Sequence, residues 1–172
     1  MRMEIRKGRA EDIPAILALL DSAAARLVTA GRTTQWGTQP LSTRAGVVRR
    51  VHEYVAEGTP WLAEIDSTPA GTLILTSGPG SGSGSAIAPA AEPEQYVHWL
   101  ATGSRFTGRG VGAALLAHAA AETRAQGLGL LRVDCYAGGD GRLVAYYESQ
   151  GFTRTETYEN DGWRGQVLER RL

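Results

Sequence analysis

The residues with the clearest chemical potential are the glycines of SRFTGRGVGAALLAHAAAE, residues 104–122. Gly108, Gly110 and Gly112 alternate with other residues, and a run of alanine and leucine, both strong helix formers, follows at once. A glycine turn that opens a helix leaves backbone N–H groups unpaired and lets an anion approach them closely, at the positive end of the helix dipole. Arg109 lies within the turn and can add a charged donor. The stretch therefore predicts a binding site for a phosphate or pyrophosphate.

Two well-known phosphate loops fit this stretch poorly. A nucleoside-triphosphate loop needs Gly-Lys-Ser/Thr after its glycines, and this chain has Gly-Val-Gly at residues 110–112. A dinucleotide fingerprint fits better, because Gly108-x-Gly110-x-x-Ala113 matches its alanine-ended variant and Asp134 follows about twenty residues later. That fold also needs repeated strand–helix units, for which too little chain remains after the turn. A dinucleotide-binding protein is retained only as a minor alternative.

The rest of the chain indicates an α/β domain in which a strand leads through the glycine turn into a helix. Apolar residues at helical spacing predict two earlier helices, one capped by Asp12 and one capped by Thr43 and ended by Gly58. A third helix should follow the turn, and a short fourth one should cover 141–150. Apolar runs bounded by turn residues predict strands in 3–8, 60–66, 70–77, 94–102, 128–136, 151–159 and 166–172.

Length and composition restrict the class of protein. The chain has 172 residues, 42% of them hydrophobic, which suits one packed core and leaves little room for a second. A formal net charge of +0 does not favour a nucleic-acid partner. No apolar run approaches the ~18 residues of a membrane span, and the N-terminus lacks a signal-peptide pattern, so we expect a cytoplasmic protein without a membrane partner. With Cys135 as its single cysteine, the chain has no internal disulfide or cysteine-based metal site, and no metal is expected.

Residues 78–93, GPGSGSGSAIAPAAEP, form a low-complexity segment that is almost uncharged. Such a composition is typical of a flexible Gly/Ser/Pro/Ala loop. A linker between two domains is the alternative, but each flank alone is too small to build a good core. We therefore expect one domain, 1–172, with this loop inside it.

Three stretches together resemble the GNAT superfamily of acetyltransferases. LATGSRFTGRGVGAALL, from residue 100, resembles its motif A, a strand followed by Q/R-x-x-G-x-G/A and a helix. YYESQGF, residues 146–152, resembles motif B, and IRKGRAEDIPAILALL, from residue 5, resembles the first strand and helix. The resemblance covers nearly the whole chain. It implies a mixed, mostly antiparallel sheet of about seven strands flanked by about four helices, and transfer of an acetyl group from acetyl-CoA directly to a primary amine.

The same resemblance implies where the cofactor lies. Backbone groups of the turn would hold the pyrophosphate, and the end of the preceding strand would pair with the pantetheine arm as an added strand does. Thr107 stands where Gln or Arg is usual, so Arg105 or Arg109 would have to supply that side-chain contact. Asp140, seven residues before Tyr147, stands where an asparagine that touches CoA is common. The full set implied is Leu100, Ala101, Thr102, Arg105, Thr107, Gly108, Arg109, Gly110, Val111, Gly112, Ala113, Asp140 and Tyr147.

Acyl transfer to an amine requires proton transfer at two atoms. An amine like that of lysine, with a pKa near ~10.4, is mostly protonated at pH 7, and the departing thiolate leaves more readily if it receives a proton. Tyr147 occupies the family's position for that donor, and Tyr146 should face elsewhere because successive helical residues point about 100° apart. His98 and Glu94, four residues apart on one strand face, are candidate bases, and a water chain or another group is the remaining alternative.

Other residues leave alternatives open. Cys135 could act as a nucleophile, but LLRVDCY reads as an interior strand in which a small buried cysteine is favoured. Trp36 and Trp163 lie in loops that wall the acceptor pocket in the resembled family, and either could simply anchor its loop. The acceptor, a small-molecule amine or a peptide, is not identified by any residue cluster, and homodimers are common in that family. Because of Thr107 and the unassigned base, an acyl-CoA-binding module without catalysis is the alternative function.

Overall fold

Seven strands and four α-helices follow one another in the order expected from the sequence. The computed structural model describes residues 1–80 and 86–172. The helices are α1 (Ile13–Thr29), α2 (Ala45–Glu57), α3 (Val111–Ala125) and α4 (Arg142–Ser149). The strands are β1 (Met3–Lys7), β2 (Thr59–Ile65), β3 (Thr68–Thr76), β4 (Gln95–Thr102), β5 (Leu130–Tyr136), β6 (Thr153–Asn160) and β7 (Trp163–Arg171). The predicted α/β fold is confirmed.

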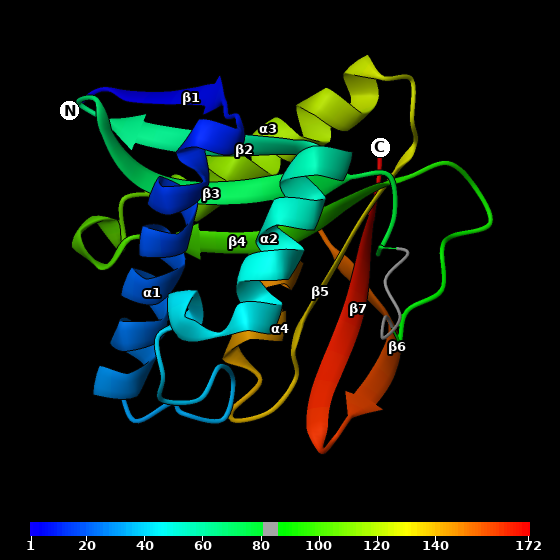
Figure 1. The fold of residues 1–172 in the computed structure, drawn as a ribbon. Helices are drawn as coiled ribbons and strands as arrows, with labels where there is room; N and C mark the ends of the chain where they lie inside the picture. The colour runs from blue at the N-terminus through cyan, green and yellow to red at the C-terminus, as the bar shows by residue number, and fades with distance from the viewer. Residues whose placement is uncertain (81–85) are drawn as a thin grey trace.

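The strands form one mixed sheet in the order β1-β2-β3-β4-β5-β7-β6. Every neighbouring pair is antiparallel except β4 and β5, which are parallel. That parallel pairing runs only from Gln95↔Leu131 to Val97↔Val133. Both strands continue beyond this point but separate, as Figure 1 shows. The sheet therefore opens near its centre.

Helices cover both faces of the sheet. In Figure 1, α1 and α2 lie in front of it and α3 and α4 behind it. The front core gathers Ile16 and Leu20 of α1 with Val51 of α2, whereas the rear core gathers Leu115 of α3 with Val97 and Val133. Because successive strand residues point to opposite faces, His98 and Asp134, which follow those two valines, point toward the front.

An irregularity in β4 lies just before the glycine turn. Trp99 has φ 52°, the left-handed conformation that a non-glycine residue rarely adopts. The register between β3 and β4 shifts at the same place, between Thr72 and Ile74. A bulge of this kind redirects the residues that follow it. It therefore sets the direction in which Leu100 and Thr102 approach the turn.

Of the two expected helix caps, Asp12 is at the predicted position but makes no cap hydrogen bond, and Thr43 is wrong. Asp12 does stand at the start of α1, but its carboxylate accepts the Arg9 N–H and the guanidinium of Arg6 and makes no cap hydrogen bond to α1. Thr43 belongs to a short 3-10 turn, where its hydroxyl donates to the Pro40 carbonyl, and α2 begins after Arg44. In both places an alternative partner nearby satisfies the side chain, which local sequence rules do not foresee.

The loop expected at 78–93 contains residues 81–85, which lie outside the described residues. The described remainder has no helix or strand. It is nevertheless tied to the sheet, because the Thr76 hydroxyl donates to the Gly78 carbonyl (2.7 Å) and Ile87 packs with Tyr96 and Val167. None of the helices in the described part of the chain has the length and apolar character that a membrane crossing requires.

Candidate functional site

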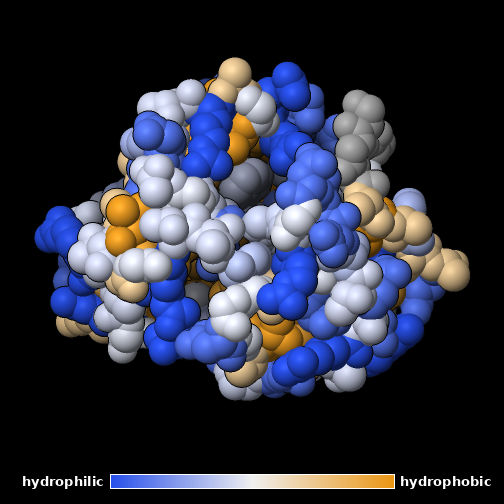
Figure 2. Space-filling model, turned by 90° about the horizontal axis from the view of Figure 1, so that it is seen from below, coloured by the Kyte–Doolittle hydropathy of each residue, from blue (hydrophilic) through white to orange (hydrophobic). Residues whose placement is uncertain are grey.

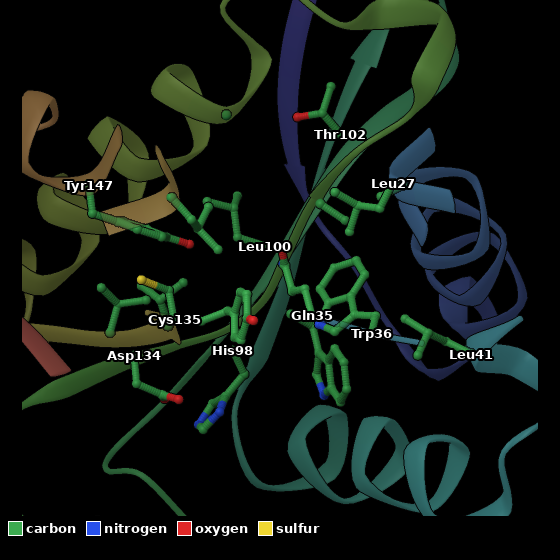
Figure 3. Close-up of a pocket in the computed structure, with 18 of the residues that line it drawn as sticks. Leu27, Gln35, Trp36, Leu41, His98, Leu100, Thr102, Asp134, Cys135 and Tyr147 are labelled. Atoms are coloured by element: carbon green, nitrogen blue, oxygen red, sulfur yellow. The ribbon is translucent and has the colours of Figure 1, made fainter. Parts of the chain in front are cut away.

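A cavity of about 990 Å³ lies where β4 and β5 separate. Its walls come from both faces of the sheet, because residues of α3 and α4 and residues of α1 and α2 line it. Figure 3 shows Tyr147, Cys135 and Asp134 on one side of the opening and Trp36 and Leu27 on the other. The cavity is thus where polar, titratable and apolar side chains from distant segments meet.

Figure 2 shows one face of the molecule, which is largely polar with apolar residues in small separate patches.

The glycine turn forms one end of this cavity, and its glycines differ in their surroundings. Gly108 and Gly110 have φ 79° and 76°, and a Cβ on either would meet nothing within 4 Å. They are therefore required by backbone conformation, and the space in front of them is open. At Gly112 a Cβ would come within 2.6 Å of the Tyr146 hydroxyl. A Cβ there would therefore require the Tyr146 side chain to shift.

Of the side chains expected to contribute to phosphate binding at the turn, one lines the cavity and two do not. Thr107 lines the cavity, and its hydroxyl donates to the Ser104 carbonyl (3.1 Å). The Arg105 and Arg109 guanidinium groups each lie 5.6 Å from the centre of the Phe106 ring, and neither residue lines the cavity. Of these three side chains, only Thr107 lines the cavity, beside the backbone of the turn.

Leu100, Ala101 and Thr102 lie on the cavity wall, as expected. On one edge, Ala101 and Thr102 pair with Thr72 and Gly71 of β3. Their other edge has no strand partner in the described part of the chain, since the pairing of β4 with β5 ends at Val97. Free backbone groups on a strand edge can hydrogen-bond an extended amide-containing ligand.

Tyr146 and Tyr147 both line the cavity but differ in environment. Tyr147 is buried at 5% exposure, and its hydroxyl points into the cavity toward Leu100 (Figure 3). Burial is the main reason why the pKa of Tyr147 lies well above its ordinary value. The hydroxyl therefore stays protonated at neutral pH. Tyr146 is only half-buried, and its hydroxyl lies against Gly112.

His98 lies in the cavity wall as a neutral ring. Its Nε2 lies 2.8 Å from the Thr76 hydroxyl and 3.3 Å from the Gly78 carbonyl, and the ring stacks on Tyr54 at 3.9 Å between centroids. A carbonyl only accepts, so these contacts assign the proton to Nε2 and leave Nδ1 as the acceptor. Burial lowers the pKa of His98 to about 4.

Glu94, the other candidate base, does not line the cavity. Its two carboxylate oxygens accept from the Arg132 guanidinium at 2.6 and 2.8 Å, and one of them also accepts the Ala90 N–H. Glu94 and Arg132 are both buried. The carboxylate thus has structural partners, and the structure does not bring it together with His98 and Tyr147.

Two further predicted residues have local structural partners. Asp140 is exposed and pairs with Arg32 (3.1 Å) and Arg142 (3.4 Å), and these contacts lower the pKa of its carboxyl group. Cys135 lines the cavity, but burial raises the pKa of its thiol to about 12. A thiol at that pKa is a poor nucleophile at neutral pH, because the thiolate is the reactive form.

Trp36 and Trp163 lie on the cavity wall. The Trp163 indole N–H donates to the Gln35 carbonyl (2.8 Å), which joins the β6–β7 hairpin to the loop after α1. Sequence reasoning missed Asp134 as part of this wall, because it read that residue only in the context of a dinucleotide fold. The available signal was its position one residue past a buried valine, on the face opposite the rear core.

Comparison with known proteins agrees with this geometry. Residues 25–152 match the Acetyltransferase (GNAT) family, which is more than half of the chain. A comparison with curated proteins finds no match. Among solved structures, the ribosomal-protein-S18-alanine N-acetyltransferase of Escherichia coli is similar over 99% of this chain and 94% of that one, with TM-score 0.70 and 16% identity.

Two other solved structures show the same fold. The IAA acetyltransferase of Bacillus cereus is similar over 99% of this chain and 100% of that one, with TM-score 0.66 and 18% identity. A Salmonella typhimurium protein solved with its cofactor acetyl-CoA is similar over 99% of this chain and 94% of that one, with TM-score 0.65 and 16% identity.

Proposed function

The chain belongs to the acetyltransferase (GNAT) family, and from that premise we propose that it moves the acetyl group of acetyl-CoA directly to a primary amine, without a covalent enzyme intermediate. The observation that carries this proposal is the unpaired edge of β4 beside the open glycine turn, because both face one cavity. The raised pKa of the Cys135 thiol supports direct transfer, since that side chain is the cavity's one sulfur nucleophile among the described residues.

The residues present fit acetyl-CoA. The backbone of residues 108–113 offers N–H groups and the positive end of α3 to a pyrophosphate, in space that no side chain fills at Gly108 and Gly110. The free edge at residues 100–102 offers hydrogen bonds to the amide groups of a pantetheine arm. The two surfaces follow each other directly in the chain, which suits a cofactor whose phosphate and amide portions are also continuous.

Bound acetyl-CoA supplies an activated acyl group, so that a carbon–nitrogen bond forms, the carbon–sulfur bond breaks and the sulfur leaves with the electron pair. Tyr147 donates its phenolic proton to that sulfur. The proton that the nitrogen loses as the amide forms restores the tyrosine by way of water. Burial raises the pKa of Tyr147 by disfavouring its anion, so the hydroxyl keeps its proton until the departing sulfur accepts it.

His98 is a weak base in this environment. With a pKa of about 4, against ~10.4 for a typical amine, taking the amine's extra proton would be uphill by roughly six pKa units, or about 8 kcal/mol. We propose instead that the extra proton of the incoming ammonium leaves to water and that His98 Nδ1 accepts a hydrogen bond from the amine. Glu94 is left out of the mechanism because Arg132 and the Ala90 N–H occupy its carboxylate.

The test is the release of CoA thiol, followed with a thiol reagent, from acetyl-CoA and a panel of small primary amines and short peptides. At least one acceptor should raise thiol release far above the rate in water and yield the N-acetyl product by mass spectrometry. If acetyl-CoA binds tightly but no acceptor supports release, the chain is the acyl-CoA-binding module that Thr107 also allows.

A further inference from the structure

Asp134 lies where β4 and β5 begin to separate. Val97 and Val133 are the last paired residues, so His98 and Asp134 are the first residues across the opening from each other. Figure 3 shows the Asp134 carboxylate on the same side of the opening as the His98 ring. An acceptor that enters the cavity from the α1–α2 face therefore meets these two side chains together.

Two tyrosine hydroxyls hold the Asp134 carboxylate in place. Tyr96 of β4 donates to Oδ1 (2.7 Å), and Tyr158 of β6 donates to Oδ2 (2.5 Å). Each carboxylate oxygen has further lone pairs, so both retain acceptor capacity. Because the donors come from two other strands, the carboxylate is fixed relative to the cavity and does not depend on the rotamer of one flexible partner.

This carboxylate has no cationic partner among the described residues, unlike Glu94. Arg132, its neighbour two residues back on β5, is bound to Glu94. The negative charge of Asp134 acts into the cavity. Burial lowers the pKa of His98 and this charge partly offsets the lowering, whereas at Tyr147 burial raises the pKa and the charge adds to the rise. A charge in a partly buried cavity attracts an opposite charge more strongly than one in open water does.

The walls around this carboxylate are aromatic. Tyr54 stacks on His98, and the ring centroids of Trp36 and Trp99 lie 6.4 Å apart. The ring centroid of Trp163 lies 5.4 Å from that of Tyr136 and 6.1 Å from that of Tyr158. Aromatic faces attract cations and also bury flat apolar groups.

Five arginines line the same cavity, namely Arg26, Arg32, Arg44, Arg50 and Arg142. Arg32 and Arg142 pair with Asp140, Arg44 donates to the backbone carbonyls of Trp36 and Gln39, and Arg26 is exposed. Arg50 stands on the same side of α2 as Glu53 and Glu57, which also line the cavity and offset its charge.

We propose that Asp134 binds the ammonium group of the acceptor and that the acceptor is a cationic primary amine attached to an aromatic or similarly flat apolar group. The inference rests on the proposed acetyl transfer and names its substrate class. Asp134 holds the ammonium group on arrival through its opposite charge. Tyr96 and Tyr158 act as positioning residues through the carboxylate.

The test compares phenethylamine, which is cationic at neutral pH, with its isomer 4-ethylaniline, whose amino group is uncharged. We expect Asp134→Asn to lower kcat/KM for phenethylamine about 30–100-fold, as for loss of a charge-assisted contact. The same variant should change kcat/KM for 4-ethylaniline and the KM for acetyl-CoA by less than about threefold, because neither depends on that charge. Equal losses with both amines would overturn the inference.

Tyr158→Phe is the matched control, because it removes one hydroxyl but keeps the charge. It should cost less than about fivefold with phenethylamine, whereas a loss as large as that in Asp134→Asn would make the carboxylate a structural anchor and overturn the inference. Thermal unfolding of each variant checks the fold.

A binding measurement on the wild-type protein decides the question if Asp134→Asn fails to fold. Calorimetry should show phenethylamine binding at least about tenfold more tightly than 2-phenylethanol, and 3-phenylpropanoate more weakly still. Equal or reversed affinities would overturn the inference. The absence of thiol release with every amine would refute acetyl transfer alone, since the binding order is measured without turnover.

Discussion

The two ends of the cavity are built from different parts of the chain. The end at the glycine turn consists of backbone, namely the free edge at residues 100–102 and the turn at 107–113, which are adjacent in sequence. The opposite end consists of side chains that come from the loop after α1, from α2 and from four strands. A backbone site is fixed by conformation, so it needs particular glycines, whereas a side-chain site can change without changing the fold.

The two ends also differ in the charged groups that they present to the cavity. The N-terminus of α3 presents partial positive charge to the cavity at Gly110. The other end presents Asp134, which is held by two hydroxyls and has no paired cation among the described residues. One end therefore suits an anionic phosphate and the other a cationic amine, with the Tyr147 hydroxyl reaching the cavity between them.

Removing the hydroxyl between the two ends should have the largest effect. Tyr147→Phe keeps the buried ring but loses the proton donor, so we expect the chemical step to slow by about 10²–10⁴-fold. Single-turnover measurement of thiol release isolates that step from product release, which would hide part of the effect if it limits turnover. Acetyl-CoA binding should be unchanged.

Tyr146→Phe is the control for this prediction. Its hydroxyl lies against Gly112 at the glycine turn, so its loss should raise the KM for acetyl-CoA a few-fold and leave the single-turnover rate unaltered. An inactive Tyr146→Phe beside an active Tyr147→Phe would exchange the two roles. Full activity in both would mean that the sulfur leaves without help from either tyrosine.

Glu94→Gln should test whether the acceptor end contains one functional carboxylate or two. The variant leaves the Arg132 guanidinium buried without its ionic partner, which we expect to cost about 3–5 kcal/mol in the free energy of unfolding. Urea unfolding measures this loss. The exposed pair Glu148–Arg154 is the control, because Glu148→Gln should cost far less. Folded Glu94→Gln protein should turn over normally, and a specific loss of activity would restore Glu94 as the base.

Gly110→Val should weaken acetyl-CoA binding by about 100-fold, because the new side chain fills the open space in front of the turn and strains its backbone. Gly127→Val is a close control, since Gly127 has φ 75° and equally open surroundings but follows the opposite end of α3. Both variants carry similar strain, so we expect them to have comparable thermal stabilities. A weaker acetyl-CoA affinity in Gly110→Val alone, measured by calorimetry, would place the phosphate at the glycine turn. Equal affinities in the two variants would exclude the glycine turn as the phosphate-binding site.

The backbone end could be anticipated from sequence because glycine spacing constrains conformation directly. Gly108 and Gly110 do adopt the left-handed conformation that makes glycine necessary, and the order of the seven strands and four α-helices was predicted correctly. The close approach at Gly112 was not foreseeable, since the Tyr146 hydroxyl that a Cβ there would meet comes from another helix.

The side-chain end could be anticipated only in part. His98 was recognised as chemically capable, but its low pKa results from burial against Tyr54 and the loop after β3, which are distant in sequence. Glu94 has the right residue type, yet its partner Arg132 lies 38 positions away. The position of Asp134 in the cavity wall depends on where the β4–β5 pairing stops, and no local sequence pattern encodes that point.

His98 should show the smallest effect on catalysis and a clear effect on stability. Burial lowers the pKa of its ring to about 4 from 6.5, so the folded protein binds this proton less readily than the unfolded chain does. Stability linked to His98 is therefore complete above pH 6.5 and is lost as the pH falls toward 4, by up to about 3 kcal/mol. In His98→Gln, urea unfolding at a series of pH values should lose less stability over that range. His52→Gln, at an exposed position on α2, should keep the wild-type pH dependence of stability.

For catalysis, kcat/KM should rise with pH toward the pKa of the amine, with no inflection near 6.5. His98→Gln should lower it by about tenfold or less. An inflection near 6.5 that disappears in His98→Gln would instead make this ring the general base and place proton transfer at the acceptor end.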